Sequence, residues 1–376
     1  MEKHLHIIDF TVPYPADYGG VIDLFWKLPA LQQQGVHIHL HCFDYGRGRQ
    51  AELDKYCASV AYYERLHGIQ GFSIKLPYIV ATRRNEQLLQ NLLQDDYPIF
   101  MEGIHSTYLL NDARFANRKK FVRVHNVEFE YYHHLYQSAT SLVQKIYFLR
   151  ESSLLKKYEH AIANKATAFW GVTTKDVEVY RNQLGCECIE YLPLYLPSNW
   201  AVNCKEGNGT FCLYQGDLSV PANEKAAIWL LEKVFNKLDI PFVIAGKNPS
   251  KQLQQLANKN QQVCLLANPA AAEMQDMVAK AHIHILPSFS SSGIKLKLLN
   301  ALYNGRHCVV NNDTVAGSGL DELCHIANDA SAMQNIIEQL YHQPFTTAEI
   351  DVRKNVLLGM FNNEANAKQQ VQWIWK

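Results

Sequence analysis

The sequence has no surplus of charge of either sign, and this absence limits its partners. Lysine plus arginine number 36 and aspartate plus glutamate number 36 in a chain of 376 residues. A general nucleic-acid-binding protein normally carries a basic excess, so we expect no nucleic-acid partner. A short basic stretch at 116–125 is better explained as the solvated edge of a strand.

The sequence also lacks segments that would direct it into or across a membrane. No run approaches the roughly 20 apolar residues that span a bilayer, and the N-terminal segment contains no signal-peptide core. The nine cysteines are scattered, odd in number and without zinc-ligand spacing, which favours a reducing compartment. We therefore expect a cytoplasmic protein, with peripheral contact at the inner membrane surface left open.

Several motifs of nucleotide and hydrolytic chemistry are missing. The first predicted strand is not followed by G-x-G-x-x-G, and the chain has no P-loop, H-E-x-x-H or G-x-S-x-G motif. It also has no D-x-D motif, so carboxylates holding a metal on a nucleotide diphosphate are not indicated. We expect no metal and no resident cofactor, with lysines and helix ends meeting any phosphate charge.

What the sequence does contain is a repeated alternation of short apolar runs and longer helical patterns. The length suggests two domains, and strand–helix alternation implies parallel sheets. We predict an α/β protein with two doubly wound, Rossmann-like domains facing a cleft. The predicted strands lie at 4–10, 37–43, 59–63, 97–103, 120–126 and 166–172, then at 210–216, 242–247, 262–268, 282–288, 307–312 and 322–328; predicted helices include 19–35, 223–238 and 270–281.

The domain boundaries follow from this alternation. The first domain is predicted at 1–195 and the second at 205–350, with a linker at 194–210 that is rich in turn-forming residues. The segment 351–376 completes a helix that opens with a Thr346/Glu349 capping box and adds a terminal helix. Its tryptophan-rich end is expected to pack against other parts of the chain.

Ligands in open parallel sheets bind beyond the carboxyl ends of strands, so the strand-to-helix turns are candidate sites. Three turns contain glycine: Gly19–Gly20, the turn after Gly216, and the loop 291–293. Glycine lets backbone N–H groups approach a ligand, and a helix N-terminus favours an anion. Taken alone, the Gly19–Gly20 pair is also compatible with an ordinary tight turn.

A lysine follows the third of these turns. A helix wound from Gly293 places Lys297 and Asn300 in one polar stripe, with Asn304 between them and apolar flanks on both sides. A lysine there would supply a full charge to a phosphate. The alternative is a surface lysine that extends its ammonium to water.

Histidines 37, 39 and 41 share one face of a predicted strand. Alternate residues on a strand lie nearly 7 Å apart, so a metal would require a ligand from a neighbouring strand. We interpret them as histidines on a partly covered strand face.

Seven segments follow one another along the chain: PYPADYGG, EGIHSTYLL, VRVHNVEFEYY, YFLRESSLLKKYE, YQGDLSVPANEKAAIWL, VIAGKNPS and LPSFSSSGIKLKLLNALYNGRHCVV. In this order they resemble the family 4-type, retaining glycosyltransferases of the GT-B fold, and the resemblance extends over nearly the whole chain. It implies transfer of a sugar from a nucleotide-diphosphate sugar to an acceptor, usually a growing saccharide. It also implies that 1–195 binds the acceptor, that 205–350 binds the donor, and that 351–376 packs back on the first domain.

The resemblance assigns candidate roles to individual residues. Lys297 would meet the diphosphate as negative charge builds on the leaving group, and His125 would position the acceptor or the transferred sugar. The remaining expected donor-binding residues are Gly19, Gly20, Gly216, Lys247, Ser291, Ser292, Gly293 and Asn300, and the expected acceptor-binding residues are His105, Asn126 and Glu128.

The chain departs from the family pattern at three positions. Ser292 and Asn300 occupy the places of two glutamates, and Asp217 stands where an arginine is usual. The main hypothesis is a glycosyltransferase of surface or extracellular polysaccharide synthesis, acting on a saccharide or lipid-linked saccharide. The alternatives are a nucleotide-sugar-binding protein without catalysis and, less favoured, a sugar-nucleotide epimerase on the same fold.

Overall fold

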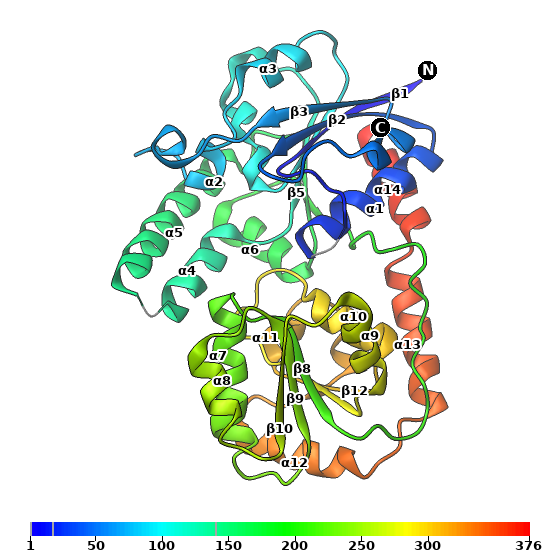
Figure 1. Ribbon diagram of the computed structural model, residues 1–376. Coiled ribbons are helices and arrows are strands. Elements are labelled where there is room, and N and C mark those ends of the chain that lie inside the picture. The colour runs from blue at the N-terminus through cyan, green and yellow to red at the C-terminus, as the bar shows by residue number, and fades with distance from the viewer. Residues whose placement is uncertain (1, 17–18, 140) are drawn as a thin grey trace. The chain divides into compact units, whose positions relative to one another are not determined.

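The computed structural model describes residues 2–16, 19–139 and 141–376. The chain divides into two compact units (Figure 1). The first comprises Met1–His133, Tyr147–Asn199 and Met360–Lys376, and the second comprises His134–Ile146 and Trp200–Gly359.

The first unit contains a seven-stranded parallel sheet in the order β3-β2-β1-β4-β5-β6-β7. The second contains a six-stranded parallel sheet in the order β10-β9-β8-β11-β12-β13. The strands are β1 (Lys3–Asp9), β2 (Val36–Asp44), β3 (Ser59–Glu64), β4 (Ile99–Glu102), β5 (Lys120–Val124), β6 (Ala168–Gly171), β7 (Ile189–Tyr191), β8 (Cys212–Asp217), β9 (Phe242–Lys247), β10 (Val263–Ala267), β11 (Ile283–Ile285), β12 (His307–Val310) and β13 (His325–Ile326).

Helices connect these strands, as the right-handed crossovers of parallel sheets require. They are α1 (Gly19–Gln33), α2 (Tyr78–Ala81), α3 (Glu86–Leu92), α4 (Glu128–Ser138), α5 (Leu142–Ile162), α6 (Thr174–Leu184), α7 (Pro221–Trp229), α8 (Lys251–Ala257), α9 (Ala271–Lys280), α10 (Leu296–Asn304), α11 (Asn312–Val315), α12 (Ala330–Tyr341), α13 (Thr347–Met360) and α14 (Asn363–Ile374). Among the described residues, none of these helices has the length and apolar character needed to cross a bilayer.

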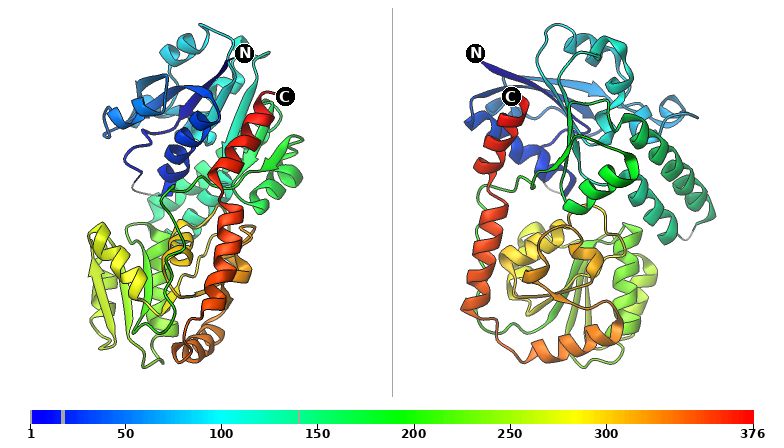
Figure 2. Two further views of the ribbon diagram at one scale, coloured as in Figure 1. Left: turned by 90° about the vertical axis from the view of Figure 1, so that its right-hand side faces the viewer. Right: turned by 180° about the vertical axis from the view of Figure 1, so that it is seen from behind.

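In both units, helices cover the two faces of the sheet. The first sheet separates two apolar clusters, one of which includes residues of α1 and α14. Helices α1 and α14 lie side by side, and Figure 2 shows them as neighbouring blue and red ribbons. In the second unit, α7 and α8 lie on one side of the sheet and α9 and α10 on the other.

The tryptophan-rich C-terminal end packs as predicted. Ile374 is fully buried in the same apolar cluster as α1, and Trp373 and Trp375 pack against that cluster. The ring of Trp373 stacks on Trp170 at 5.6 Å between centroids. The start of the linker contacts the same helix, since the hydroxyl of Tyr195 donates to Gln370 Oε1 over 2.7 Å.

All twelve predicted strands are present, with bounds shifted by a few residues. Strand β7 was not predicted, because it is only three residues long. The helix predicted to wind from Gly293 begins instead at Leu296. Gly293 has a positive φ of 67° and Lys295 is extended, so neither can belong to the first helical turn.

Candidate functional site

Each sheet reverses its strand order beside its first strand. Strand β1 lies between β2 and β4, and β8 lies between β9 and β11. Ligands of open parallel sheets bind beyond the carboxyl ends of the strands at such a reversal. The turns after β1, β4, β8 and β11 are therefore candidate ligand-binding positions. Together with the helices that follow them, they contain most of the predicted site residues.

Lys297 lies at the reversal of the second sheet. Its Nζ donates to the side-chain oxygen of Asn223 over 3.1 Å and to the Tyr214 hydroxyl over 3.3 Å. The same ammonium lies 4.8 Å from the centroid of the Tyr214 ring. Tyr214 belongs to β8 and Asn223 to the first turns of α7. The lysine is thus held among α10, β8 and α7, and its ammonium is directed at these partners.

The environment of Lys297 favours binding of an anion. Burial, together with the nearby charge of Lys295, lowers the pKa of Lys297 to about 7. The site contains neutral hydrogen-bond partners, and no carboxylate forms an ion pair with this ammonium in the described part of the chain. A bound phosphate would supply the missing negative charge and stabilise the protonated lysine.

The loop before α10 is organised by a second lysine. The Nζ of Lys295 donates to the backbone carbonyls of Ser292, over 2.5 Å, and Gly293, over 3.3 Å. Trans peptide groups point their N–H and C=O in opposite directions, so the amides of Gly293 and Ile294 point away from this ammonium. Ser291, Ser292 and Gly293 are buried, and their expected contact with donor phosphates stays a prediction.

The other predicted donor residues of the second unit have distinct surroundings. Gly216 lies next to Asn223, the partner of Lys297, and a Cβ at this position would meet the Asn223 side chain at an ordinary contact distance of 3.4 Å. Lys247 ends β9 with an exposed side chain. Asn300 uses its side-chain oxygen to accept from Asn304 Nδ2 over 2.9 Å. The Asp217 carboxylate accepts from Ser219 of its own turn.

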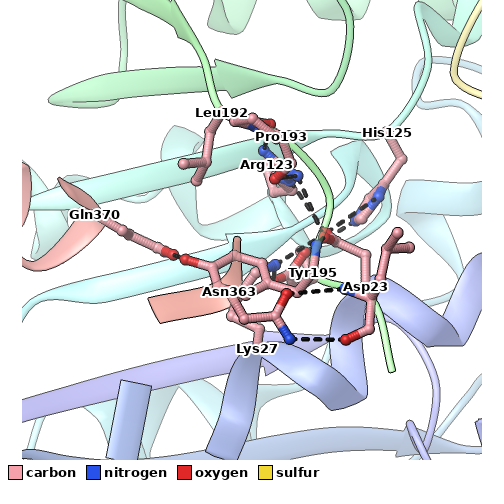
Figure 3. Close-up of polar contacts among 11 residues, drawn as sticks. Asp23, Lys27, Arg123, His125, Leu192, Pro193, Tyr195, Asn363 and Gln370 are labelled. Carbon is pink, nitrogen blue, oxygen red and sulfur yellow. Dashed lines mark hydrogen bonds and ion pairs between the residues drawn. The ribbon is translucent and has the colours of Figure 1, made fainter. Parts of the chain in front are cut away.

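In the first unit, His125 lies just after β5 and is hydrogen-bonded to a buried carboxylate. Its Nε2 is 2.9 Å from Glu102 Oε2, and its Nδ1 is 3.9 Å from Asp23 Oδ2 (Figure 3). Glu102 ends β4 and is fully buried, whereas 18% of the His125 side chain is exposed. This arrangement fixes the orientation of a ring that retains access to solvent.

A buried network of ions lies behind His125. Lys27 of α1 forms ion pairs with Asp23, over 3.1 Å, and with Glu102. Arg123 contacts Asp23 through its Nε over 3.1 Å. It also donates to the carbonyls of Leu192 and Pro193 at the start of the linker.

The charges of this network balance. Burial opposes ionisation of Asp23, but Arg123 and Lys27 outweigh it and lower the pKa of that carboxyl. Burial and the nearby Glu102 raise the pKa of Asp9 well above its usual value. In the ion pairs of this network, the carboxylates of Asp23 and Glu102 face the cations of Lys27 and Arg123. One ligand atom each of Asp23, Glu102 and His125 lies close enough to the other two to hold a metal. In this structure, Lys27 and Arg123 already pair with the two carboxylates of this group.

The predicted acceptor residues cluster in part. The His105 ring stacks on Phe10 at 4.7 Å, and Phe10 meets His125 edge-on at 6.0 Å, so the two histidines flank one ring. Burial lowers the pKa of His105 well below its ordinary value. Asn126 Nδ2 donates weakly to Glu128 over 3.4 Å, and burial raises the pKa of the buried Glu128 to about 7.

Gly19 and Gly20 are the first two residues of α1, the helix that also carries Asp23 and Lys27. The sequence did not predict the residues that surround Lys297 and His125, which are Tyr214, Asn223, Lys295, Asp23, Lys27, Glu102 and Arg123. Two features of the sequence could have indicated the ion network. Glu102 and Arg123 lie inside segments that carry the family resemblance, and Asp23 and Lys27 are four residues apart on a predicted helix.

Comparison with known sequences adds the class of chemistry. Residues 210–343 match the family described as glycosyl transferases group 1. This match, over about a third of the chain, indicates glycosyltransferase activity. The chain is also 27% identical over 346 residues to an uncharacterized 44.6 kDa protein in the cps region of Klebsiella pneumoniae, an alignment that covers 86% of this chain and 87% of the relative.

Solved structures agree with the fold. HepE of Anabaena, crystallised with UDP and glucose, is 13% identical to the glycosyltransferase, covers 98% of both chains and gives a TM-score of 0.63. The UDP-forming alpha,alpha-trehalose-phosphate synthase of Burkholderia xenovorans, in complex with glucose-6-phosphate, is 11% identical, covers 100% of both chains and gives a TM-score of 0.65. These likenesses confirm the predicted GT-B fold of two Rossmann-like domains.

Proposed function

We propose that this glycosyltransferase moves a sugar from a nucleotide-diphosphate sugar to a saccharide or lipid-linked saccharide. The reaction would retain the anomeric configuration and need no metal, and its product would be a surface or extracellular polysaccharide. The match of 210–343 supports the transferase class. The position of the Klebsiella pneumoniae relative in a cps region supports the polysaccharide context.

The observation that carries the proposal is the environment of Lys297. Its ammonium lies at the carboxyl end of β8, held by Tyr214 and Asn223 and unopposed by a carboxylate among its described hydrogen-bond partners. Negative charge develops on the leaving diphosphate during sugar transfer. A preorganised cation directed at that charge lowers the barrier without a metal. Lys247 and the amides of 291–293 are proposed as further phosphate contacts.

On the acceptor side, we assign a positioning role to His125. The hydrogen bond to Glu102 fixes its ring, and Phe10 joins it to the neighbouring His105. Asn126 and Glu128 follow directly in the chain and complete the proposed acceptor group. Gly19 and Gly20 would allow close approach of the donor phosphate to the start of α1.

The proposed location is the cytoplasm, with contact at the inner face of the membrane where a lipid-linked acceptor would be met. Leu142, Val143 and Ile146 at the start of α5 are exposed apolar residues that suit such a contact.

The direct test is turnover in a matched pair of lysine variants. Lys297→Ala should lower release of nucleoside diphosphate from UDP-, GDP-, ADP- or dTDP-sugars by about 10²–10³-fold, the cost of losing one transition-state donor. Lys280→Ala removes an exposed lysine of α9 that pairs with Asp276 and should leave turnover unchanged. Circular dichroism of both variants checks the fold. Unchanged turnover in Lys297→Ala would reject the assigned role.

The alternative of binding without catalysis rests on Ser292 and Asn300, which replace the family glutamates. Asn300 can accept or donate hydrogen bonds but holds no charge. Donor binding with neither hydrolysis nor transfer across a broad acceptor panel would favour that alternative. Appearance of an epimerised donor without any acceptor would instead favour the epimerase.

A further inference from the structure

The second unit contains a cluster of metal-ligand side chains that the proposed transfer does not use. His307, His325 and Glu349 line a cavity of about 320 Å³. One ligand atom from each residue lies within 4.8 Å of the other two. The three residues come from β12, β13 and the first turn of α13.

The sheet register explains why the two histidines meet. In the parallel pair of β12 and β13, His325 lies opposite Val309. His307 lies two positions before Val309 and therefore points to the same face of the sheet. Both histidines are the first residues of their strands. The cluster thus lies at the amino ends of the strands, whereas Lys297 contacts the region beyond the carboxyl end of β8.

His307 presents a lone pair to the cluster. Its Nε2 lies 3.1 Å from the backbone carbonyl of Gln343, which can only accept, so the ring proton is on Nε2. Its Nδ1 has no hydrogen-bond partner among the described residues and lies 3.4 Å from Glu349 Oε1. In this neutral tautomer, an unprotonated nitrogen faces a carboxylate oxygen.

The two lone pairs repel unless a cation lies between them. A metal-bound histidine characteristically donates its other ring N–H to a carbonyl, as His307 does. Glu349 is fixed from behind, because its Oε2 accepts from the amide of Thr346 over 2.8 Å and from its hydroxyl over 2.7 Å. Its Oε1 is left facing His307.

The nearby cation of Arg353 does not fill this place. Its guanidinium donates to the backbone carbonyls of Leu302, Gly305 and Arg306. Across the described part of the chain, no ion pair joins Arg353 to Glu349. The lone pairs of the cluster therefore lack a cation of the protein's own.

We propose that His307, His325 and Glu349 bind a zinc ion. Two imidazoles and one carboxylate are ligands that suit zinc, at roughly 2.0–2.2 Å from the metal. A water molecule from the cavity would take the fourth tetrahedral position. The ion would join the first turn of α13 to the starts of β12 and β13 and stabilise this edge of the second unit. This ion would lie apart from the metal-free donor chemistry, and it would overturn the expectation from the sequence that the chain binds no metal.

The test measures zinc directly and needs no sugar donor, so its result is independent of the proposed transfer. Chelator-treated full-length protein is titrated with Zn²⁺ by calorimetry and with Co²⁺ by visible absorption, under reducing conditions. The wild type should bind one ion through the cluster, show the d–d bands of tetrahedral Co²⁺, and melt at a higher temperature with zinc than without it.

Two glutamate variants sharpen the test. Glu349→Gln removes the anionic ligand but keeps a side chain that can complete the capping box with Thr346. It should weaken zinc binding by at least about 10-fold, the smallest loss typical of disturbing such a site. Glu322→Gln changes an exposed glutamate that lines the same cavity outside the cluster, and it should leave zinc affinity unchanged.

The histidines of β1 and β2 also lie close together, since the rings of His4 and His37 stack at 4.9 Å and His4 contacts His39, so zinc bound there has to be distinguished from zinc bound at the cluster. The titrations are therefore repeated in a His37→Gln/His39→Gln background. Tight binding that survives this background and is lost with Glu349→Gln supports the proposal. No binding in the wild type, or binding that Glu349→Gln leaves unchanged, overturns it.

Discussion

At the scale of single residues, burial distinguishes two lysines of the proposed donor site. Lys297 and Lys247 both lie near the carboxyl ends of strands in the second unit. The Lys297 pKa is lowered to about 7 by burial and by Lys295, whereas the side chain of Lys247 is exposed. The ammonium of Lys297 therefore loses its proton near neutral pH, and this has a measurable consequence.

Donor binding should weaken as the pH rises above 7. A bound diphosphate requires the ammonium form of Lys297, and in the free protein this form declines above its pKa of about 7. Affinity for the nucleoside diphosphate should fall roughly 20-fold between pH 6.5 and 8.5. Calorimetric titration across this range measures the effect. In Lys297→Arg the charge persists, so a slope equal to that of the wild type would contradict the explanation.

Lys297 and His125 could be predicted from the sequence because each lies inside a short, ordered motif. Their partners could not, because they are distant in the chain: Asn223 is 74 residues and Tyr214 83 residues from Lys297. The low pKa of Lys297 also depends on burial, which a motif does not contain. The candidate residues could thus be selected from the sequence, whereas their surroundings could not, and their roles stay predictions.

At the scale of elements, the ion network joins α1, β4 and β5. Asp23 and Lys27 come from the helix, while Glu102 and Arg123 come from the strands. The same network reaches the linker through the carbonyls of Leu192 and Pro193. The helix opened by Gly19 and Gly20 is therefore fixed to the strand that precedes His125.

Glu102→Gln should weaken both this attachment and the orientation of His125. Removing one charge from a buried ion pair typically costs about 3–5 kcal/mol, because a buried charge is left uncompensated; here Lys27 and Arg123 would share the single carboxylate of Asp23. Urea unfolding should show this loss, and turnover should fall in the folded variant. Glu86→Gln, at the exposed pair with Arg114, is the control and should change neither. A free energy of unfolding in Glu102→Gln equal to that of the wild type would show that the network does not stabilise the fold.

Element positions were predictable where the apolar pattern was long enough. The twelve predicted strands all formed, and the Thr346/Glu349 capping box is present. The short edge strand β7 offers only three residues of pattern and was missed. The start of α10 was misplaced by three residues, because the positive φ of Gly293 overrides the helical periodicity that follows it.

At the scale of the whole molecule, many buried titratable groups give stability a defined pH dependence. Among the described residues, eight histidines have pKa values lowered chiefly by burial. Four carboxyls have pKa values raised by burial. The histidines contribute stability that is present above about pH 6.5 and is lost as the pH falls. The carboxyls favour the folded state at lower pH.

Thermal stability should therefore fall as the pH drops below about 6.5. In that range the eight histidines outnumber the four carboxyls, and the unfolded chain binds more protons than the folded one. Above pH 7 the effects oppose one another, because Glu128, with a pKa of about 7, and Glu159, with a pKa of about 8, still hold protons in the folded state, whereas Lys297, with a pKa of about 7, loses its proton there. Calorimetric scans from pH 5 to 8.5 measure Tm; a Tm that rises steadily as the pH falls would refute this balance.

The two-domain α/β architecture was predictable from length and strand–helix alternation, and the GT-B fold from the resemblance. The zinc cluster was not, because its ligands lie at 307, 325 and 349 with no recognisable spacing. Sheet register and the first turn of a helix bring them together, and neither is encoded in a local pattern.

The central claim, that the ammonium of Lys297 binds a nucleotide sugar through its diphosphate, is tested most directly by thermal shift. Wild type, Lys297→Ala and Lys280→Ala are melted with UDP-, GDP-, ADP- and dTDP-sugars. A ligand at 100 times its Kd stabilises the folded state by about 2.7 kcal/mol. We predict that one nucleotide class raises the Tm of the wild type and of Lys280→Ala but not that of Lys297→Ala at the same concentration. An equal rise in Lys297→Ala would contradict the account.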